Sequence, residues 1–175
     1  MWGARLSSRS LHRPAALAAK RPRRIHLHEN LTVLFENRDT LRYQIQEIMR
    51  VERIVREADI VHEIETYNAL LGEPGELGCV LMIEVPDAAL RAELLVKWHG
   101  LQERLYVSLA DGTRVFASFD PAQVGDERIS AVQYLRFQVA GRTPVGIGTD
   151  FDGLESHMAL TPEQLAALTE DLTRQ

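Results

Sequence analysis

Apolar runs along the chain predict a mainly antiparallel sheet of five or six strands. Residues 24–37 (RIHLHENLTVLFEN) combine β-branched and aromatic side chains with partial alternation, which predicts one or two strands. Residues 77–85 (LGCVLMIEV) are almost entirely apolar, as is typical of a central strand that is buried on both faces. Alternation in residues 130–139 predicts a further strand, and residues 144–148 (PVGIG) predict another.

The clearest turn signal is the dipeptide Asp111-Gly112, which lies between two strand-like runs in residues 104–119. Asp and Gly tolerate the positive φ angles of a type I′ turn, in which two central residues connect the strands of a hairpin. The sequence therefore predicts a β-hairpin with a type I′ turn and with positive φ at Gly112.

Periodic apolar positions predict two or three helices. The first covers residues 39–58 after a cap at Asn37 or Asp39, and the second repeats apolar residues every fourth position up to Gly100. The last begins after Thr161, where Gln164 completes a capping box.

The predicted fold class is α+β, because the strands are partly joined by hairpins and the helices pack on the sheet. We expect a basic N-terminal arm at residues 1–24 and a single α+β domain at residues 25–175.

The helix predicted at residues 39–58 carries polar groups on its apolar side. At about 100° per residue, Gln44 and Glu52 fall within the arc of the apolar residues. An unpaired carboxylate in a core costs several kcal/mol, so we expect a buried Glu52 with a bound partner. Arg56, an arginine from the sheet and a metal ion are the alternatives. The apolar arc consists of Leu41, Ile45, Ile48, Val51 and Val55, and the opposite polar face consists of Arg42, Gln46, Arg50, Arg53 and Glu57.

Charge is distributed unevenly along the chain. Residues 1–24 hold seven of the 20 basic residues and no acid, so the rest has 13 basic against 25 acidic groups, a formal charge of −12. The basic segment can be a solvated terminus, a strip lying on the acidic body, an arm for an anionic partner, or an organelle-targeting segment. An acidic body argues against nucleic acid as the main ligand.

No apolar run in the sequence reaches the length of a membrane span. We expect a cytoplasmic protein, and the sequence does not determine its oligomeric state.

Candidate metal ligands are few. The single cysteine, Cys79, rules out an internal disulfide and a cysteine-only zinc or iron–sulfur site. His26 and His28 are two residues apart, so both imidazoles can project from one face of a strand toward a divalent metal ion. His62 with Glu63 or Glu65, or Glu36, could complete such a site, and Glu52 is a further candidate ligand. Because no complete catalytic motif is present, whether the chain is an enzyme stays open.

Residues 31–54 (LTVLFENRDTLRYQIQEIMRVERI) resemble the signature of a bacterial family of unknown function. Further similarity lies at residues 67–71 (YNALL), 83–87 (IEVPD) and 130–139 (SAVQYLRFQV). Members of this family are often encoded beside rubrerythrin-like proteins and heterodisulfide-reductase-like iron–sulfur proteins, so the resemblance implies a redox or oxidative-stress setting. Within this signature, the polar residues that we assign to binding are Glu36, Arg38, Asp39, Gln44, Gln46, Glu47, Arg50, Glu52 and Arg53.

Three functional hypotheses follow. The leading one is a non-catalytic accessory protein that docks on a rubrerythrin-like or iron–sulfur redox partner through the polar face of helix 39–58. The second is a metal-binding protein or enzyme that uses Glu52 together with Glu36, Glu47 or a histidine. The third is a small-ligand sensor with a pocket beneath the helix.

Overall fold

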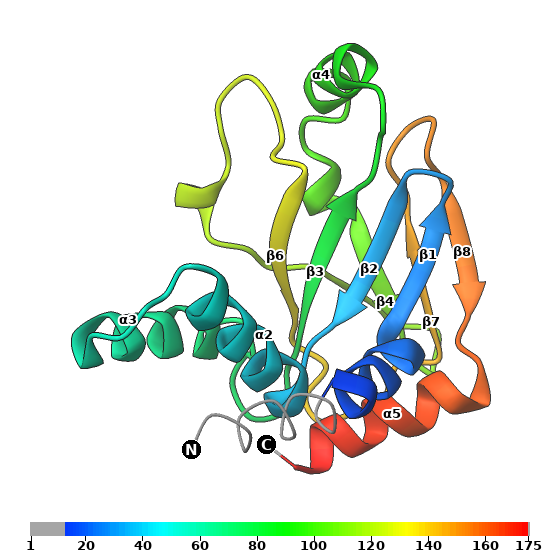
Figure 1. Cartoon of the computed structure of the whole chain (residues 1–175). Coiled ribbons are helices and arrows are strands. Elements are labelled where there is room, and N and C mark those ends of the chain that lie inside the picture. The colour runs from blue at the N-terminus through cyan, green and yellow to red at the C-terminus, as the bar shows by residue number, and fades with distance from the viewer. Residues whose placement is uncertain (1–12, 175) are drawn as a thin grey trace.

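The computed structural model of the chain describes residues 13–174, which form two four-stranded antiparallel sheets and several helices (Figure 1). The first sheet has the order β1-β2-β3-β6, and the second has the order β5-β4-β7-β8. The strands of the first sheet are β1 (Arg24–His28), β2 (Leu31–Phe35), β3 (Leu77–Ile83) and β6 (Val132–Phe137). Those of the second are β4 (Leu105–Ser108), β5 (Arg114–Phe116), β7 (Gly146–Thr149) and β8 (Ser156–Ala159).

The two sheets enclose one core. Just after β5 the chain crosses to the first sheet, where Ser118 pairs with Arg136 of β6. At the other edge, β8 lies against β1. The side chains between the sheets are apolar and belong to a single buried cluster, which includes Val33, Leu81, Leu135, Val107 and Ile147.

The longer α-helices of the described residues are α2 (Arg38–Val51), α3 (Glu57–Asn68), α4 (Ala88–Lys97) and α5 (Pro162–Thr173). Helices α4 and α5 lie at opposite ends of the strands, whereas α3 projects sideways from the sheets (Figure 1). Residues 13–20 are also helical and precede a short 3-10 helix, η1 (Arg21–Arg23). Within residues 13–174, no helix combines the length and the apolar character that crossing a bilayer requires.

The predicted α+β class is confirmed, although the second sheet contains one strand, β8, that the sequence did not indicate. Eight strands are present in the described residues, against the five or six predicted. The strand that the sequence did not indicate is β8, which has only four residues. Its side chains are exposed or half-buried, so it lacks the apolar pattern by which a strand is found in a sequence.

The prediction of one continuous helix over residues 39–58 is wrong. Helix α2 ends at Val51, and Arg53 adopts the left-handed conformation with φ 52°. The N–H of Ile54 then donates to the carbonyl of Met49 at 2.9 Å, which closes the helix end as in a Schellman motif. Glycine usually occupies this left-handed position, and its absence here removed the signal for the break.

The predicted hairpin is confirmed between β4 and β5, and Gly112 has φ 85°. The type I′ assignment is wrong, because Asp111 does not have positive φ. The N–H of Gly112 donates to the carbonyl of Leu109 at 2.9 Å, and the N–H of Leu109 donates to the carbonyl of Thr113 at 2.9 Å. Three residues therefore form the loop, which is the length that combines a type I turn with a glycine bulge.

Candidate functional site

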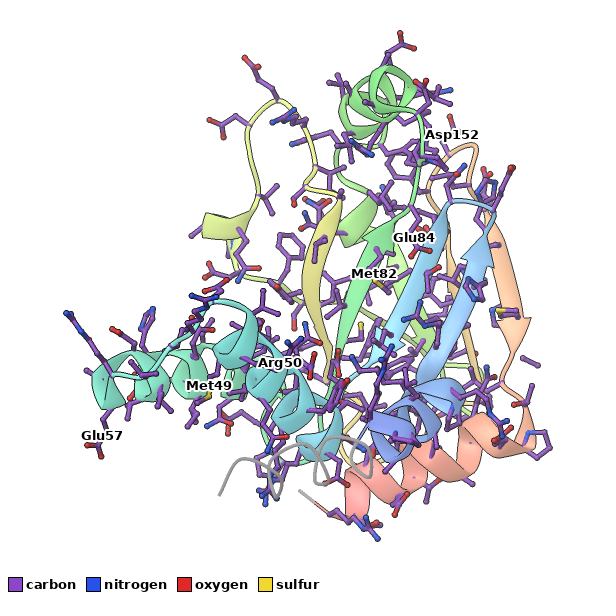
Figure 2. All side chains as sticks on the ribbon, viewed as in Figure 1. Met49, Arg50, Glu57, Met82, Glu84 and Asp152 are labelled. Carbon is purple, nitrogen blue, oxygen red and sulfur yellow. The ribbon has the colours of Figure 1, made fainter. Side chains whose placement is uncertain are left out.

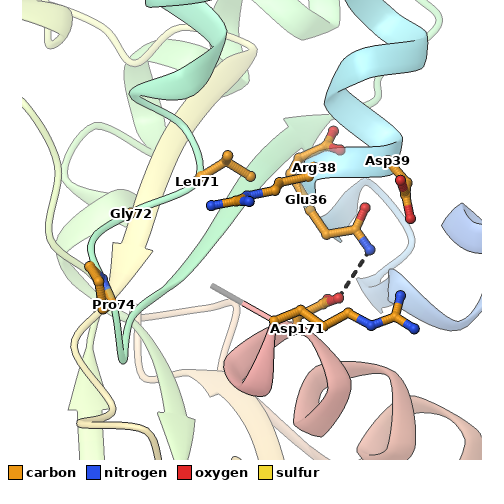
Figure 3. Close-up of a pocket in the computed structure, with 9 residues that line it drawn as sticks. Glu36, Arg38, Asp39, Leu71, Gly72, Pro74 and Asp171 are labelled. Carbon is orange, nitrogen blue, oxygen red and sulfur yellow. Dashed lines mark hydrogen bonds between the residues drawn. The ribbon is translucent and has the colours of Figure 1, made fainter.

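A cavity of about 380 Å³ lies between the start of α2, the loop that follows α3 and the end of α5. The loop contributes an apolar wall, while the two helices contribute charged side chains (Figure 3). Four neighbouring residues of the family-like signature contribute to the lining. The full lining consists of Glu36, Asn37, Arg38, Asp39, Leu71, Gly72, Pro74, Asp171 and Arg174.

The sequence Glu36–Thr40 fixes the start of α2 and so positions one side of this cavity. The Asn37 side chain accepts a hydrogen bond from the backbone N–H of Thr40 at 2.9 Å. In return, the Thr40 hydroxyl accepts from the backbone N–H of Asn37 at 2.9 Å. This reciprocal capping box satisfies two backbone donors that a helix start leaves without partners, and the Thr40 hydroxyl also donates to Glu36.

A buried ion pair joins the N-terminal segment to α5 beside the cavity. Arg23 of η1 donates from Nε to Oδ2 of Asp171 and from Nη2 to Oδ1, each at 2.8 Å. Asn37 adds a hydrogen bond from Nδ2 to Asp171 Oδ1 at 3.0 Å, drawn as the dashed line in Figure 3. Burial alone would lower the pKa of Arg23, but the bond to Asp171 and its charge raise that pKa overall. Arg23 therefore keeps its charge, and these hydrogen bonds link η1, α2 and α5.

Glu36 is a carboxyl group with little access to water, since only 5% of the residue is exposed. Burial raises its pKa, while the hydrogen bond from Thr40 and the charges of Lys20, Arg24 and Arg23 partly oppose that rise. Within residues 13–174, its Oε1 atom accepts no hydrogen bond, and the residue lines the cavity. The cavity thus contains a carboxyl group that holds its proton more tightly than an ordinary glutamate.

The raised pKa of Glu36 makes a testable prediction about pH. Because the folded chain holds this proton more tightly than the unfolded chain, Glu36 stabilises the fold at low pH. That contribution is lost as the pH rises through the folded-state pKa. Glu36→Gln keeps the shape and accepts the bond from Thr40 without a charge. We expect the variant to be more stable than the parent at neutral pH, with the difference shrinking in acid, as measured by urea unfolding across pH. A difference that does not change with pH would contradict this.

Arg38 and Asp39 lie in the first turn of α2, and both are exposed. Figure 3 shows the Arg38 side chain extending across the cavity toward Leu71 and Gly72. Among the described residues, the Arg38 guanidinium has no acidic partner and no hydrogen-bond acceptor. It therefore remains available to a bound molecule.

The prediction of a buried Glu52 is wrong. Glu52 is exposed at the end of α2, and its carboxylate has no hydrogen bond or ion pair, with Arg56 or any other residue, within the described chain. The reason is that α2 continues past the edge of the sheets, so its apolar side is buried only near its start. Leu41 is buried, whereas Val51 and Val55 are 67% and 85% exposed.

Gln44 has a structural partner on each side. Its Oε1 accepts a hydrogen bond from Lys20 Nζ at 3.2 Å, and its side chain also bonds to Tyr67 of α3. The polar residue on the apolar side of α2 thus ties the N-terminal segment to both helices. Burial raises the pKa of Tyr67, an effect that the bond from Gln44 partly opposes.

The other signature residues lie along α2 and at its end, away from the cavity. Gln46, Arg50 and Arg53 are exposed, and Glu47 is half-buried. Arg50 Nη2 pairs with Glu47 Oε2 at 3.1 Å. The binding set predicted from the sequence is therefore split, with Glu36, Arg38 and Asp39 at the cavity and the remaining members on the outer part of the helix.

The structure places His26 and His28 on the exposed face of β1. A register irregularity lies between these two residues, and His26 Nδ1 is 2.9 Å from Thr32 Oγ1. In residues 13–174, no three potential metal ligands gather into one group, so Glu52 does not join the histidines. This arrangement gives the metal hypothesis no support.

Sequence reasoning missed the residues that α5 and the N-terminal segment bring to the site. Arg23 was one of several arginines in a basic segment, and Asp171 was one acid in a terminal helix. Neither residue carries a local signal, because their pairing joins positions 148 residues apart. Gly72 and Pro74 were not among the candidate residues, and Leu71 appeared only within the family resemblance at residues 67–71.

Comparisons with known proteins place the chain in a family. No match was found among curated proteins. The structure is similar to the crystal structure of a novel protein of unknown function from Burkholderia pseudomallei, with a TM-score of 0.86 and 29% sequence identity. That similarity covers 97% of this chain and 93% of the other. A family model described as a protein of unknown function (DUF3501) matches residues 5–172, so the chain belongs to the DUF3501 family.

Proposed function

We propose that the protein is an accessory protein of a redox or oxidative-stress system and docks on its partner through the arm formed by α2 and α3 (residues 38–68). The observation that carries this proposal is the exposed apolar surface at the end of α2. Figure 2 shows Arg50 and Glu57 on this arm, to the side of the two sheets. The arm is therefore accessible to another protein.

Most of the arm contributes little to the core of this chain. Thr40 and Leu41 are the buried residues of α2, and α3 has none. The exposed large apolar residues of the arm are Val51, Val55, Val61 and Ile64. A helical segment that leaves valines and an isoleucine in water is typical of a surface that another protein covers.

The charge of the elbow between the helices indicates what kind of surface fits it. Residues 50–56 (RVERIVR) contain three arginines and one glutamate, a formal charge of +2. These charged residues are all exposed and flank Val51 and Val55. A complementary partner would present an apolar patch bordered by carboxylates, since opposite charges at the rim guide association and orient the docked proteins.

The class of partner comes from the resemblance of the signature to a family encoded near redox proteins. Rubrerythrin-like proteins and heterodisulfide-reductase-like iron–sulfur proteins are therefore the expected partners. The docking surface differs from the one expected from the sequence. It includes the apolar end of α2 as well as the polar face, because the structure leaves that apolar end uncovered.

Substitution at the elbow tests this function. Val55→Asp introduces a charge at a residue that is 85% exposed, so it should leave folding unchanged. The tagged full chain should recover a rubrerythrin-like or iron–sulfur protein from its native host under oxidative stress, and Val55→Asp should lose most of that recovery. The measurement is mass spectrometry of the co-purified proteins, followed by binding assays with the identified protein.

Val96→Asp on α4 is the matched control, because Val96 is 55% exposed and lies at a different part of the molecule. It should recover the partner as well as the parent chain does. Recovery of no redox protein by the parent, or equal recovery by Val55→Asp, would refute the proposal.

A further inference from the structure

We infer that the cavity at the start of α2 binds a small molecule through a carboxylate group, with Arg38 as the residue that recognises it. The cavity volume, about 380 Å³, lies within the range of sites for small molecules. This site lies at the start of α2, whereas the proposed docking rests on the apolar residues and the elbow at the other end of that helix. Either proposal can therefore fail without the other.

The guanidinium of Arg38 supplies the first contact. It has no acidic partner among the described residues and extends across the cavity (Figure 3). A planar guanidinium matches a carboxylate, because two parallel N–H groups can donate to its two oxygens. Arg174 lines the same cavity and adds positive charge, although it also pairs with Glu170 at 2.8 Å.

The backbone at the start of α2 supplies further donors. The N–H of Thr40 donates to the Asn37 side chain, and the N–H of Leu41 donates to the carbonyl of Asn37 at 3.0 Å. The N–H groups of Arg38 and Asp39 precede these bonds, so they have no acceptor in the helix ladder. Such N–H groups, together with the helix dipole, favour a negative group near Arg38.

Glu36 is the second, independent feature of the cavity. It is nearly completely buried, and its Oε1 atom has no donor within the described chain. A protonated Glu36 can donate a hydrogen bond to an oxygen of the ligand. Its raised pKa supports that protonation state.

The acidic residues of the lining favour a singly charged ligand. Asp39 is exposed at the cavity, and Asp171 lies at its base. Arg23 and Asn37 already occupy the oxygens of Asp171, but the exposed carboxylate of Asp39 would repel a dianion such as phosphate. Leu71 and Pro74 form an apolar wall. This combination fits a monocarboxylate with a short carbon chain.

Titration of the full chain, labelled with ¹⁵N, against sodium butyrate tests the inference. Butyrate is expected to shift the backbone amide signals of Arg38 and Gly72, with a Kd on the order of 1 mM for so small a probe. Butan-1-ol, which has the same carbon chain without the charge, should not shift them. Absence of butyrate shifts in that range, or stronger binding of inorganic phosphate, would overturn the inference.

Two variants then identify the contact. Arg38→Gln removes the guanidinium from an exposed position and should raise the Kd for butyrate about tenfold or more. Arg128→Gln removes an exposed arginine from the loop before β6 and should leave the Kd unchanged. The thermal midpoint of each variant verifies that it is folded. Equal affinity of Arg38→Gln and the parent would overturn the role assigned to Arg38.

Discussion

Replacing Arg23 with methionine is expected to lower the free energy of unfolding by about 3–5 kcal/mol, the cost of removing one partner from a buried ion pair. Arg23 and Asp171 are 4% and 6% exposed, and two 2.8 Å hydrogen bonds join their side chains. Without Arg23, the Asp171 carboxylate would stay buried with only the Asn37 amide as donor. Urea unfolding of the parent and the variant at pH 7 measures the difference.

A neighbouring pair provides the control for this prediction. Arg21 Nη2 also lies 2.8 Å from a carboxylate of α5, that of Glu163, but this pair is exposed. Arg21→Met should therefore change stability by less than about 1 kcal/mol. The double variant Arg23→Met with Asp171→Leu should recover much of the loss, because no charge remains buried. Equal losses of unfolding free energy in Arg21→Met and Arg23→Met would show that burial does not make the Arg23–Asp171 pair stronger than the exposed Arg21–Glu163 pair.

The elements with strong local signals were predictable from the sequence. Strand β3 is almost entirely apolar, the glycine of the β4–β5 hairpin has positive φ, and Thr161 with Gln164 forms the capping box of α5. Each of these depends on residues that are adjacent or nearly adjacent in the chain. The resemblance of residues 31–54 also indicated the family to which the chain belongs.

The error at Glu52 has a different origin. A helical projection shows which residues share one side of a helix, but it cannot show how far along the helix the core extends. Helix α2 packs on the core through Leu41 and then continues past it, so the same apolar side becomes exposed at Val51. The apolar pattern was read correctly, whereas the assumption that this entire side is buried was wrong.

The composition of the cavity was not predictable, because three distant segments form it. The signature residues Glu36, Arg38 and Asp39 come from one segment, the loop at residues 71–74 from another and α5 from a third. Only the first segment was a candidate from its sequence. The Arg23–Asp171 pair, whose partners are distant in sequence, joins α5 to the N-terminal segment.

A single methyl group at Gly78 is expected to destabilise the chain by about 3 kcal/mol or more. Gly78 lies within β3, where its carbonyl accepts a hydrogen bond from the N–H of Glu36 at 3.0 Å. A Cβ atom there would lie 1.7 Å from the carbonyl oxygen of Leu70 and 2.9 Å from its carbon. Because the obstacle is backbone, no side-chain rotation can relieve it.

The backbone near Leu70 also has little freedom to move away. The N–H of Leu70 donates to the carbonyl of Tyr67 at 3.0 Å, and the N–H of Leu71 donates to that of Asn68 at 3.1 Å. Gly78→Ala must therefore displace either β3 or the turn that ends α3, and the second displacement would also move the Leu71 wall of the cavity.

Gly125→Ala is the control, since Gly125 is exposed and its added Cβ would meet only Arg128 O, at 3.2 Å. We expect a change within about 0.5 kcal/mol for this control. Equal thermal midpoints for Gly78→Ala and the parent would show that the turn after α3 can move away from β3 at little cost in stability, and would contradict this prediction.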